Sequence, residues 1–131
     1  MKKLIIFLVP LFIMAGCKKV EKEPLGPTDI RVKSLAAGVV MNELTVETGG
    51  GTFNYGTLNG GDTTEYHPFE KAYPKANISA IINGQKYKTD TVTYYYMQYL
   101  GQVKATYVIY IESETLKKLK ISDVIMESPL K

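Results

Sequence analysis

Apolar and polar residues alternate along most of the chain after residue 28. Ile30, Val32 and Ser34 share one face of the first extended segment, and Leu44 and Val46 share one face of the second. A period of two places successive side chains on opposite faces of a strand, so this pattern is typical of antiparallel strands with one buried face. The alternation therefore predicts a β domain.

Turn-forming residues divide this pattern into short segments. Three glycines at positions 49–51, the run Asn59-Gly60-Gly61-Asp62, and Pro68 each predict the end of a strand. Asn83-Gly84 predicts a hairpin with a type I′ turn, because both residues accept positive φ angles. The expected strands are residues 29–34, 43–47, 52–58, 63–66, 78–82, 85–89, 91–99, 104–112 and 120–126, with one helical turn or a loop at 116–119. In the last strand, Ile121, Val124 and Ile125 are expected to pack inward.

Roughly eight short strands over about a hundred residues are typical of an all-β, antiparallel, immunoglobulin-like β-sandwich. A small barrel is the alternative. The sandwich closes a core between two sheets without a disulfide, which suits a chain with one cysteine.

The first seventeen residues have the pattern of a bacterial lipoprotein signal. Lys2 and Lys3 supply positive charge, an apolar run follows, and Met14-Ala15-Gly16-Cys17 is a lipobox-like cleavage site. The run is shorter than the roughly 20 residues that a membrane-spanning helix needs. We therefore expect cleavage before Cys17 and a membrane anchor of acyl chains on Cys17. An ordinary secretory peptide and a core helix are the alternatives.

This pattern divides the chain into three parts: a signal peptide at 1–16, a lipidated N-terminus and flexible tether at 17–28, and one β-sandwich domain at 29–131. Removing Lys2 and Lys3 leaves 14 basic against 13 acidic residues, since the whole chain has 16 and 13. Positive side chains are interspersed with acids, which excludes a phosphate-binding stripe and thus nucleic acid as a partner. The expected location is the bacterial cell envelope, on the outer membrane, with the periplasmic or surface side left open.

Three segments resemble a known group of proteins: Asn54–Leu58, Gly60–Tyr66 and Phe69–Tyr73. With the Asn83-Gly84 hairpin and the lysine-rich segment after Cys17, they are similar to small, uncharacterised immunoglobulin-like lipoproteins of Bacteroidetes-type bacteria. The resemblance covers residues 30 to about 112, and the chain departs from the group after the tyrosine cluster. It implies an immunoglobulin-like fold and an envelope compartment, and it brings no catalytic residues.

Few residues suit catalysis or metal binding. His67 is the single histidine, so a catalytic triad would have to be built around it, with Asp62 or Glu65 nearby. Calcium would need clustered oxygen ligands, whereas Asp62, Asp90 and Asp123 each lie beside separate turns. We therefore expect a non-enzyme with no metal and no cofactor.

Ten tyrosines are the most distinctive part of the composition. Tyr94, Tyr96, Tyr99 and Tyr110 are the candidate binding residues, because tyrosine rings stack on sugars and anchor protein partners. Tyr95 would point away from Tyr94 and Tyr96 in a strand, so one face of this cluster is expected to lie in the core. Two roles for these tyrosines are left open: they fill the faces of the sheet, or they form a binding surface.

These observations predict a lipid-anchored envelope protein that acts as a non-catalytic protein-interaction or structural module. This function predicts an exposed apolar patch or an open sheet edge. The alternative is glycan or small-ligand binding through a tyrosine-bearing sheet surface, which predicts a concave site with aromatic faces and polar groups. The expected partners are the membrane, through the lipid, and an envelope protein or glycan; the oligomeric state stays open.

Overall fold

A computed structural model of the chain describes residues 27–49, 51–94 and 97–127. These residues form eight strands and no helix: β1 (Thr28–Ser34), β2 (Val40–Thr48), β3 (Gly51–Asn59), β4 (His67–Phe69), β5 (Asn77–Ile82), β6 (Gln85–Lys88), β7 (Lys104–Ser113) and β8 (Lys118–Glu127). The predicted all-β class is confirmed. The predicted signal peptide and Cys17 lie outside the described residues.

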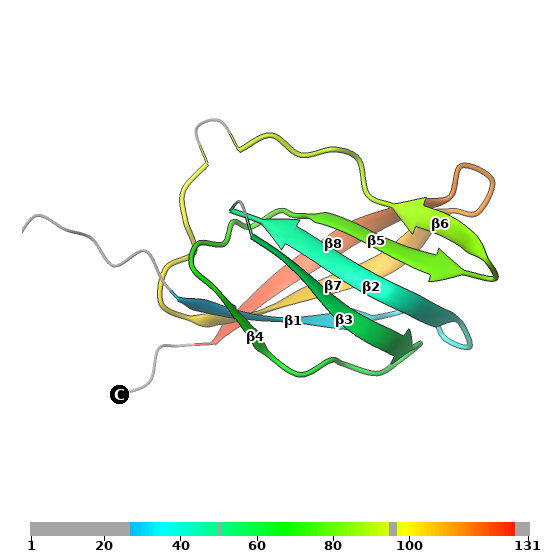
Figure 1. Cartoon of the computed structure of the whole chain (residues 1–131), viewed down its shortest axis with the longest axis horizontal. Helices are drawn as coiled ribbons and strands as arrows, with labels where there is room; N and C mark the ends of the chain where they lie inside the picture. The colour runs from blue at the N-terminus through cyan, green and yellow to red at the C-terminus, as the bar shows by residue number, and fades with distance from the viewer. Residues whose placement is uncertain (1–26, 50, 95–96, 128–131) are drawn as a thin grey trace, which may run out of the picture.

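The strands form one sheet in the order β3-β2-β5-β6-β8-β7-β1-β4. Between β6 and β8 a single residue pair, Lys88 with Lys118, holds the sheet together. This narrow junction divides the sheet into two halves of four strands, and Figure 1 shows β2, β3, β5 and β6 crossing in front of β1, β7 and β8.

The expectation of purely antiparallel pairing was wrong. β1 and β7 pair in parallel over Asp29–Ser34 and Lys104–Ile109, and the β6–β8 pair is parallel as well. Parallel neighbours require a crossover connection. Between β1 and β7 the crossover contains β2–β6, and between β6 and β8 it contains β7 and the long connection that precedes Lys104. In Figure 1 this connection runs back along the molecule as an arch.

The core lies between the two halves of the sheet. One half contributes Met41, Leu44, Val46 and Ile78, and the other contributes Ile30, Val32, Tyr107, Ile109 and Leu119, all almost fully buried. Burying each large aliphatic side chain stabilises the fold by about 1.5–3 kcal/mol. The alternation in the sequence assigned the inward faces of β1 and β2 correctly.

The predicted hairpin at Asn83-Gly84 is confirmed. Asn83 and Gly84 have φ angles of 52° and 77°, and they join Ile82 to Gln85 in an antiparallel register. Positive φ at both central residues matches a two-residue turn of the I′ kind, whose twist fits the flanking strands. β6, the second strand of this hairpin, is the edge of its half of the sheet at the Lys88–Lys118 junction.

The strand expected at residues 63–66 is wrong. Thr63 forms an isolated bridge with Lys33. At Thr64 the backbone N donates to Val32 O at 2.9 Å, but the return bond from Val32 N at 3.0 Å goes to the Thr64 hydroxyl instead of a carbonyl. Regular pairing resumes at His67 in β4. Pro68 belongs to this strand instead of ending a strand, because β4 is an edge strand and its missing N–H costs no ladder bond.

The strand expected at residues 91–99 is also wrong. Its described residues form no strand and are held by scattered bonds, including Val92 N to Asn77 Oδ1 at 2.8 Å and Met97 N to Tyr94 O at 3.2 Å. The tyrosines and β-branched residues of this segment pack their side chains without pairing their backbone in a sheet. Strand propensity mainly reflects the side-chain environment, so it does not ensure a strand here.

β8 departs from the prediction at both ends. It begins at Lys118, directly after a turn in which Lys117 has a φ of 56°. Of the helical turn or loop predicted at 116–119, the loop is found at 116–117, the helical turn is absent, and 118–119 belong to β8. Ile125, expected to pack inward, is 49% exposed. Its orientation changes because Ser122 is an extra residue in the register with β7, a bulge that shifts the face of every residue after it.

Candidate functional site

Two of the four candidate tyrosines meet at one place. The ring of Tyr94 stacks on Tyr73 with centroids 4.4 Å apart, and the Tyr99 ring is tilted against Tyr73 at 5.2 Å. Lys71 places its Nζ 5.2 Å above the Tyr99 ring. Because Tyr73 is buried and Tyr99 is 38% exposed, this cluster is a rim of the core with one accessible ring.

The other two candidate tyrosines do not join this cluster within the structure described. Tyr96 lies outside the described residues. Tyr110 is half-buried on β7, where it pairs with Lys120 of β8. It is an odd number of residues from the core residue Tyr107, so it occupies the opposite face of β7.

Hydrogen bonds tie the phenols of this region to the backbone. Tyr107 Oη donates to the Tyr73 carbonyl, and Tyr94 Oη donates to the carbonyl and the carboxylate of Glu47 at 3.1 and 3.3 Å. Burial, and then the Glu47 charge, raise the pKa of Tyr94 to about 12. Burial likewise raises the pKa of Tyr107. These phenols are neutral hydrogen-bond donors, and their rings pack within the protein. Tyr94 therefore does not form a flat, exposed tyrosine platform.

The two halves of the sheet meet at two seams, and each seam leaves a hollow. The first seam is the Lys88–Lys118 junction. Beyond it the chain turns away from β8, because Thr89 N donates to Ile78 O at 2.9 Å and so follows β5. The hollow between the Thr89–Val92 segment and β8, here called the β8 groove, has a volume of about 370 Å³.

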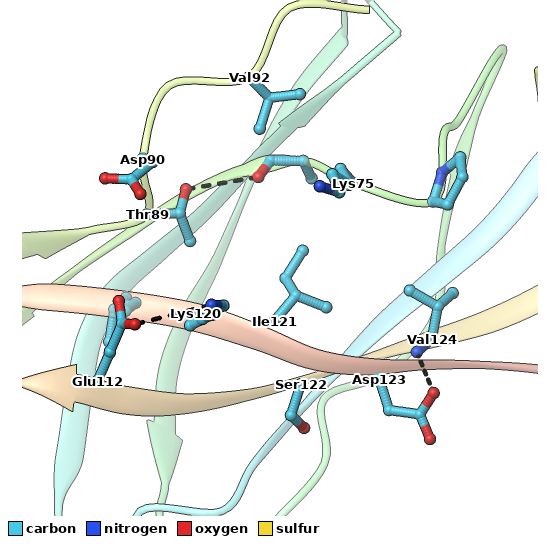
Figure 2. Close-up of a pocket in the computed structure, with 13 residues that line it drawn as sticks. Lys75, Thr89, Asp90, Val92, Glu112, Lys120, Ile121, Ser122, Asp123 and Val124 are labelled. Carbon is cyan, nitrogen blue, oxygen red and sulfur yellow. Dashed lines mark hydrogen bonds and ion pairs between the residues drawn. The ribbon is translucent and has the colours of Figure 1, made fainter. Parts of the chain in front are cut away.

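The β8 groove has an apolar lining and a charged rim. Its apolar residues are Pro74, Ala76, Val92, Leu119, Ile121 and Val124. Figure 2 shows Ile121 and Val124 rising from β8 toward the segment that carries Val92. On the rim, Lys118 pairs with Asp90 at 3.1 Å and Lys120 with Glu112 at 3.7 Å. Such exposed pairs contribute under about 1 kcal/mol each, so they define the rim without locking it.

One edge of β8 is open. Nine residue pairs join β8 to β7, whereas only Lys118 pairs with β6, so among the described residues the edge from Leu119 to Glu127 has no strand partner. The Ser122 bulge interrupts this edge, and Ile125 and Met126 beyond it are 49% and 55% exposed. An open edge presents unpaired N–H and C=O groups that an extended chain can bind.

The second seam joins the outer strands β3 and β4 through aromatic rings. Phe53 of β3 stacks on His67 of β4 with centroids 3.6 Å apart, and Tyr55 and Phe69 continue the row by edge contacts at 4.8 and 5.2 Å. Tyr55 Oη donates to the Ile30 carbonyl at 2.7 Å. This row, rather than a hydrogen-bonded ladder, brings the two ends of the sheet together.

A second hollow of about 440 Å³ lies beside this aromatic row and is here called the β3 hollow. Its aromatic lining consists of Phe53, Tyr55 and Tyr66, and its polar lining includes Thr57, Asn59, Asp62, Thr63, Thr64 and Glu65. The sequence pattern predicted a strand at 52–58, which carries Phe53 and Tyr55. It gave no means of finding the wall opposite, because the 60–66 segment is held against β1 by irregular bonds.

The residues considered for catalysis or calcium have structural surroundings. His67 is packed between the rings of Phe53 and Phe69. Asp90 pairs with Lys118, Asp123 Oδ1 accepts a bond from Val124 N, and Asp62 lines the β3 hollow. Within residues 27–49, 51–94 and 97–127, no group of three or more His, Cys, Asp or Glu side chains is arranged to hold a metal.

Comparisons with known proteins add little to this geometry. No protein-family model and no curated protein sequence matches the chain. An NMR structure of a protein from Eubacterium rectale aligns with 74% of this chain and 89% of its own, at 11% identity and a TM-score of 0.49. In the described part of the chain, no helix is long and apolar enough to cross a membrane.

Proposed function

We propose that this protein is a lipid-anchored bacterial envelope lipoprotein whose β domain binds partner proteins and performs no catalysis. The open edge of β8 is the observation that carries the binding role, because a partner strand can extend the sheet there. The regular end of that edge carries exposed Ile125 and Met126. Apolar side chains on an accessible edge are a recognised mark of an interaction site.

The membrane anchor rests on the sequence. Cys17 follows Met14-Ala15-Gly16, and ten residues separate it from Thr28 at the start of β1. Even fully extended, those residues span at most about 40 Å, so the domain would stay close to the lipid surface. The proposed location is the outer membrane.

We also propose that the fold belongs with immunoglobulin-like sandwiches. The support is the division of the sheet into two four-stranded halves that share one core, and the resemblance to small Bacteroidetes-type lipoproteins. The parallel β1–β7 pair and the Lys88–Lys118 junction are the features by which this domain would differ from a purely antiparallel sandwich.

Cell fractionation tests the anchor. We expect the wild-type protein in the membrane fraction and a Cys17→Ala variant outside it, because acyl chains contribute about 0.8 kcal/mol per buried methylene. Protease added to intact cells then separates a surface location from a periplasmic one. A Cys17→Ala variant that stays in the membrane fraction would show that the lipid anchor is wrong.

Native electrophoresis of detergent-solubilised membranes tests the binding role. We expect wild type in a complex larger than one chain, and an Ile125→Lys/Met126→Lys variant at the size of the free chain, since two charges on the edge oppose strand pairing. Leu116→Lys is the matched control, because Leu116 is 68% exposed in the turn before β8. The binding role fails if the edge variant and the control migrate alike.

A further inference from the structure

We propose that the β3 hollow is a binding site for uncharged, polyhydroxylated ligands, of which neutral oligosaccharides are the main class. This site lies at the second seam, and its lining includes no residue of β8. Its volume of about 440 Å³ falls within the roughly 300–1,000 Å³ of small-molecule sites. The inference rests on the aromatic wall, on the polar groups across from it, and on the sign of their charge.

The β3 side of the aromatic wall is already fixed in position. Phe53 is held from one face by the stacked His67 ring at 3.6 Å, and Tyr55 is held by its bond to the Ile30 carbonyl. Burial raises the pKa of Tyr55, so this phenol is a neutral donor. Rings that need no reordering bind a ligand without the entropy cost of immobilising side chains.

Tyr66 on the opposite side of the hollow is held as well. The guanidinium carbon of Arg31 lies 4.6 Å from the centre of its ring, and Lys104 Nζ lies 5.1 Å from it. Its Oη donates to Glu127 Oε2 at 3.2 Å. Neither Arg31 nor Lys104 belongs to the lining of the hollow, so a ligand bound there would not have to displace them.

The polar lining suits hydroxyl groups. Asp62 and Glu65 are exposed carboxylates, and neither belongs to an ion pair among the residues described. Each carboxylate accepts hydrogen bonds through two oxygens, and such bonds are stronger than those between neutral groups. Thr57, whose hydroxyl donates to Asn42 Oδ1 at 3.0 Å, keeps acceptor capacity toward the hollow.

The charge of the lining selects against acids. Asp62 and Glu65 are the acidic side chains of the lining, which includes no lysine, arginine or histidine. A ligand carboxylate or phosphate would meet like charge from the wall formed by residues 60–66. Uncharged sugars meet ring faces and hydrogen-bond acceptors without that repulsion.

Titration calorimetry on the full chain tests the proposal. The chain is solubilised in a detergent without a sugar headgroup, and maltose, cellobiose, N,N′-diacetylchitobiose and digalacturonate are the probes. We expect millimolar or tighter binding of at least one neutral disaccharide. Digalacturonate should bind at least about tenfold more weakly. Amide NMR signals of Thr57, Thr63 and Tyr66 should shift with the bound sugar.

Removing the two carboxylates of the lining tests their role in binding. An Asp62→Ala/Glu65→Ala variant should bind the sugar at least about tenfold more weakly, a loss of roughly 1.4 kcal/mol. Glu70→Ala/Glu114→Ala, which removes two exposed acids outside the β3 hollow, should bind as wild type does. The proposal is overturned if no neutral disaccharide binds, if digalacturonate binds equally well, or if both variants keep wild-type affinity.

Discussion

Two glycines mark the tightest backbone contacts of the domain. A Cβ on Gly60 would lie 1.8 Å from the Ala36 carbonyl oxygen, and a Cβ on Gly49 would lie 2.3 Å from the Lys71 carbonyl oxygen. Gly49 also has a φ of 59°, whereas Gly60 has no positive φ. The sequence predicts a turn at each of these glycines, and both lie in turns. Nothing nearby in the sequence indicates that backbone from another segment occupies the place of a Cβ there.

Gly60→Ala should destabilise the protein by at least about 2 kcal/mol, because the new methyl group forces backbone to move in a packed region. Gly84→Ala is the control. It has a positive φ of 77° and open space around the added Cβ, so a cost of only about 1 kcal/mol is expected. Urea unfolding of the two variants measures the difference; equal losses would contradict the steric argument.

Buried tyrosines make the stability sensitive to alkali. The folded state raises the pKa of Tyr94 to about 12 and raises that of Tyr107 as well, from an ordinary value of 10.0. Because the fold favours the neutral phenol, its contribution is complete below pH 10 and is lost as pH rises from there through the folded pKa. We expect the free energy of unfolding, measured in urea, to fall steadily above that pH.

Tyr107→Phe separates the two contributions of this phenol. At neutral pH it should cost about 1–3 kcal/mol, because the Tyr73 carbonyl loses a buried donor. In alkali the variant should lose less stability than wild type. Tyr110→Phe, at a half-buried position, should change neither quantity by more than about 0.5 kcal/mol. If the free energy of unfolding of Tyr107→Phe falls with alkaline pH as steeply as that of wild type, the Tyr107 phenol is not a source of the alkali sensitivity.

Elements with local causes were predictable from the sequence, and elements with distant causes were not. Asn83-Gly84 determines its hairpin within a few residues, so the β5–β6 prediction is confirmed. The parallel β1–β7 pair joins Asp29 to Lys104, and nothing near either residue indicates it. The same holds for the candidate site. The tyrosines could be identified in the sequence, but the two hollows could not, because each is formed where a seam brings distant segments together.

The aromatic row tests whether the second seam depends on side chains. Phe53→Leu removes the stacking on His67 and the edge contact with Tyr55, so it should cost about 0.5–1.5 kcal/mol beyond the change in burial. Hydrogen exchange should become faster in β3 and β4 and stay unchanged in β5 and β6. Val40→Ala, at a side chain that is 47% exposed on β2, is the control. Uniformly faster exchange would argue against a local seam.

At the scale of the whole molecule, one core belongs to both halves of the sheet. Ile78→Ala in one half and Ile109→Ala in the other should each destabilise the protein by about 2–5 kcal/mol. Both variants should keep a single transition, with far-ultraviolet circular dichroism and tyrosine fluorescence coinciding. Two separated transitions in either variant would show that the narrow Lys88–Lys118 junction divides the domain into independent folding units.

The register places the start of β1 and the end of β8 at the same end of the molecule. Asp29 lies beside Lys104, and Lys104 lies beside Glu127, so two strand spacings of about 4.8 Å separate the first and last strands there. A few glycines would bridge that gap. The domain is therefore suited to circular permutation, with Glu127 joined to Thr28 and the chain reopened at Asn83-Gly84, and to insertion as a cassette into a surface loop of another protein.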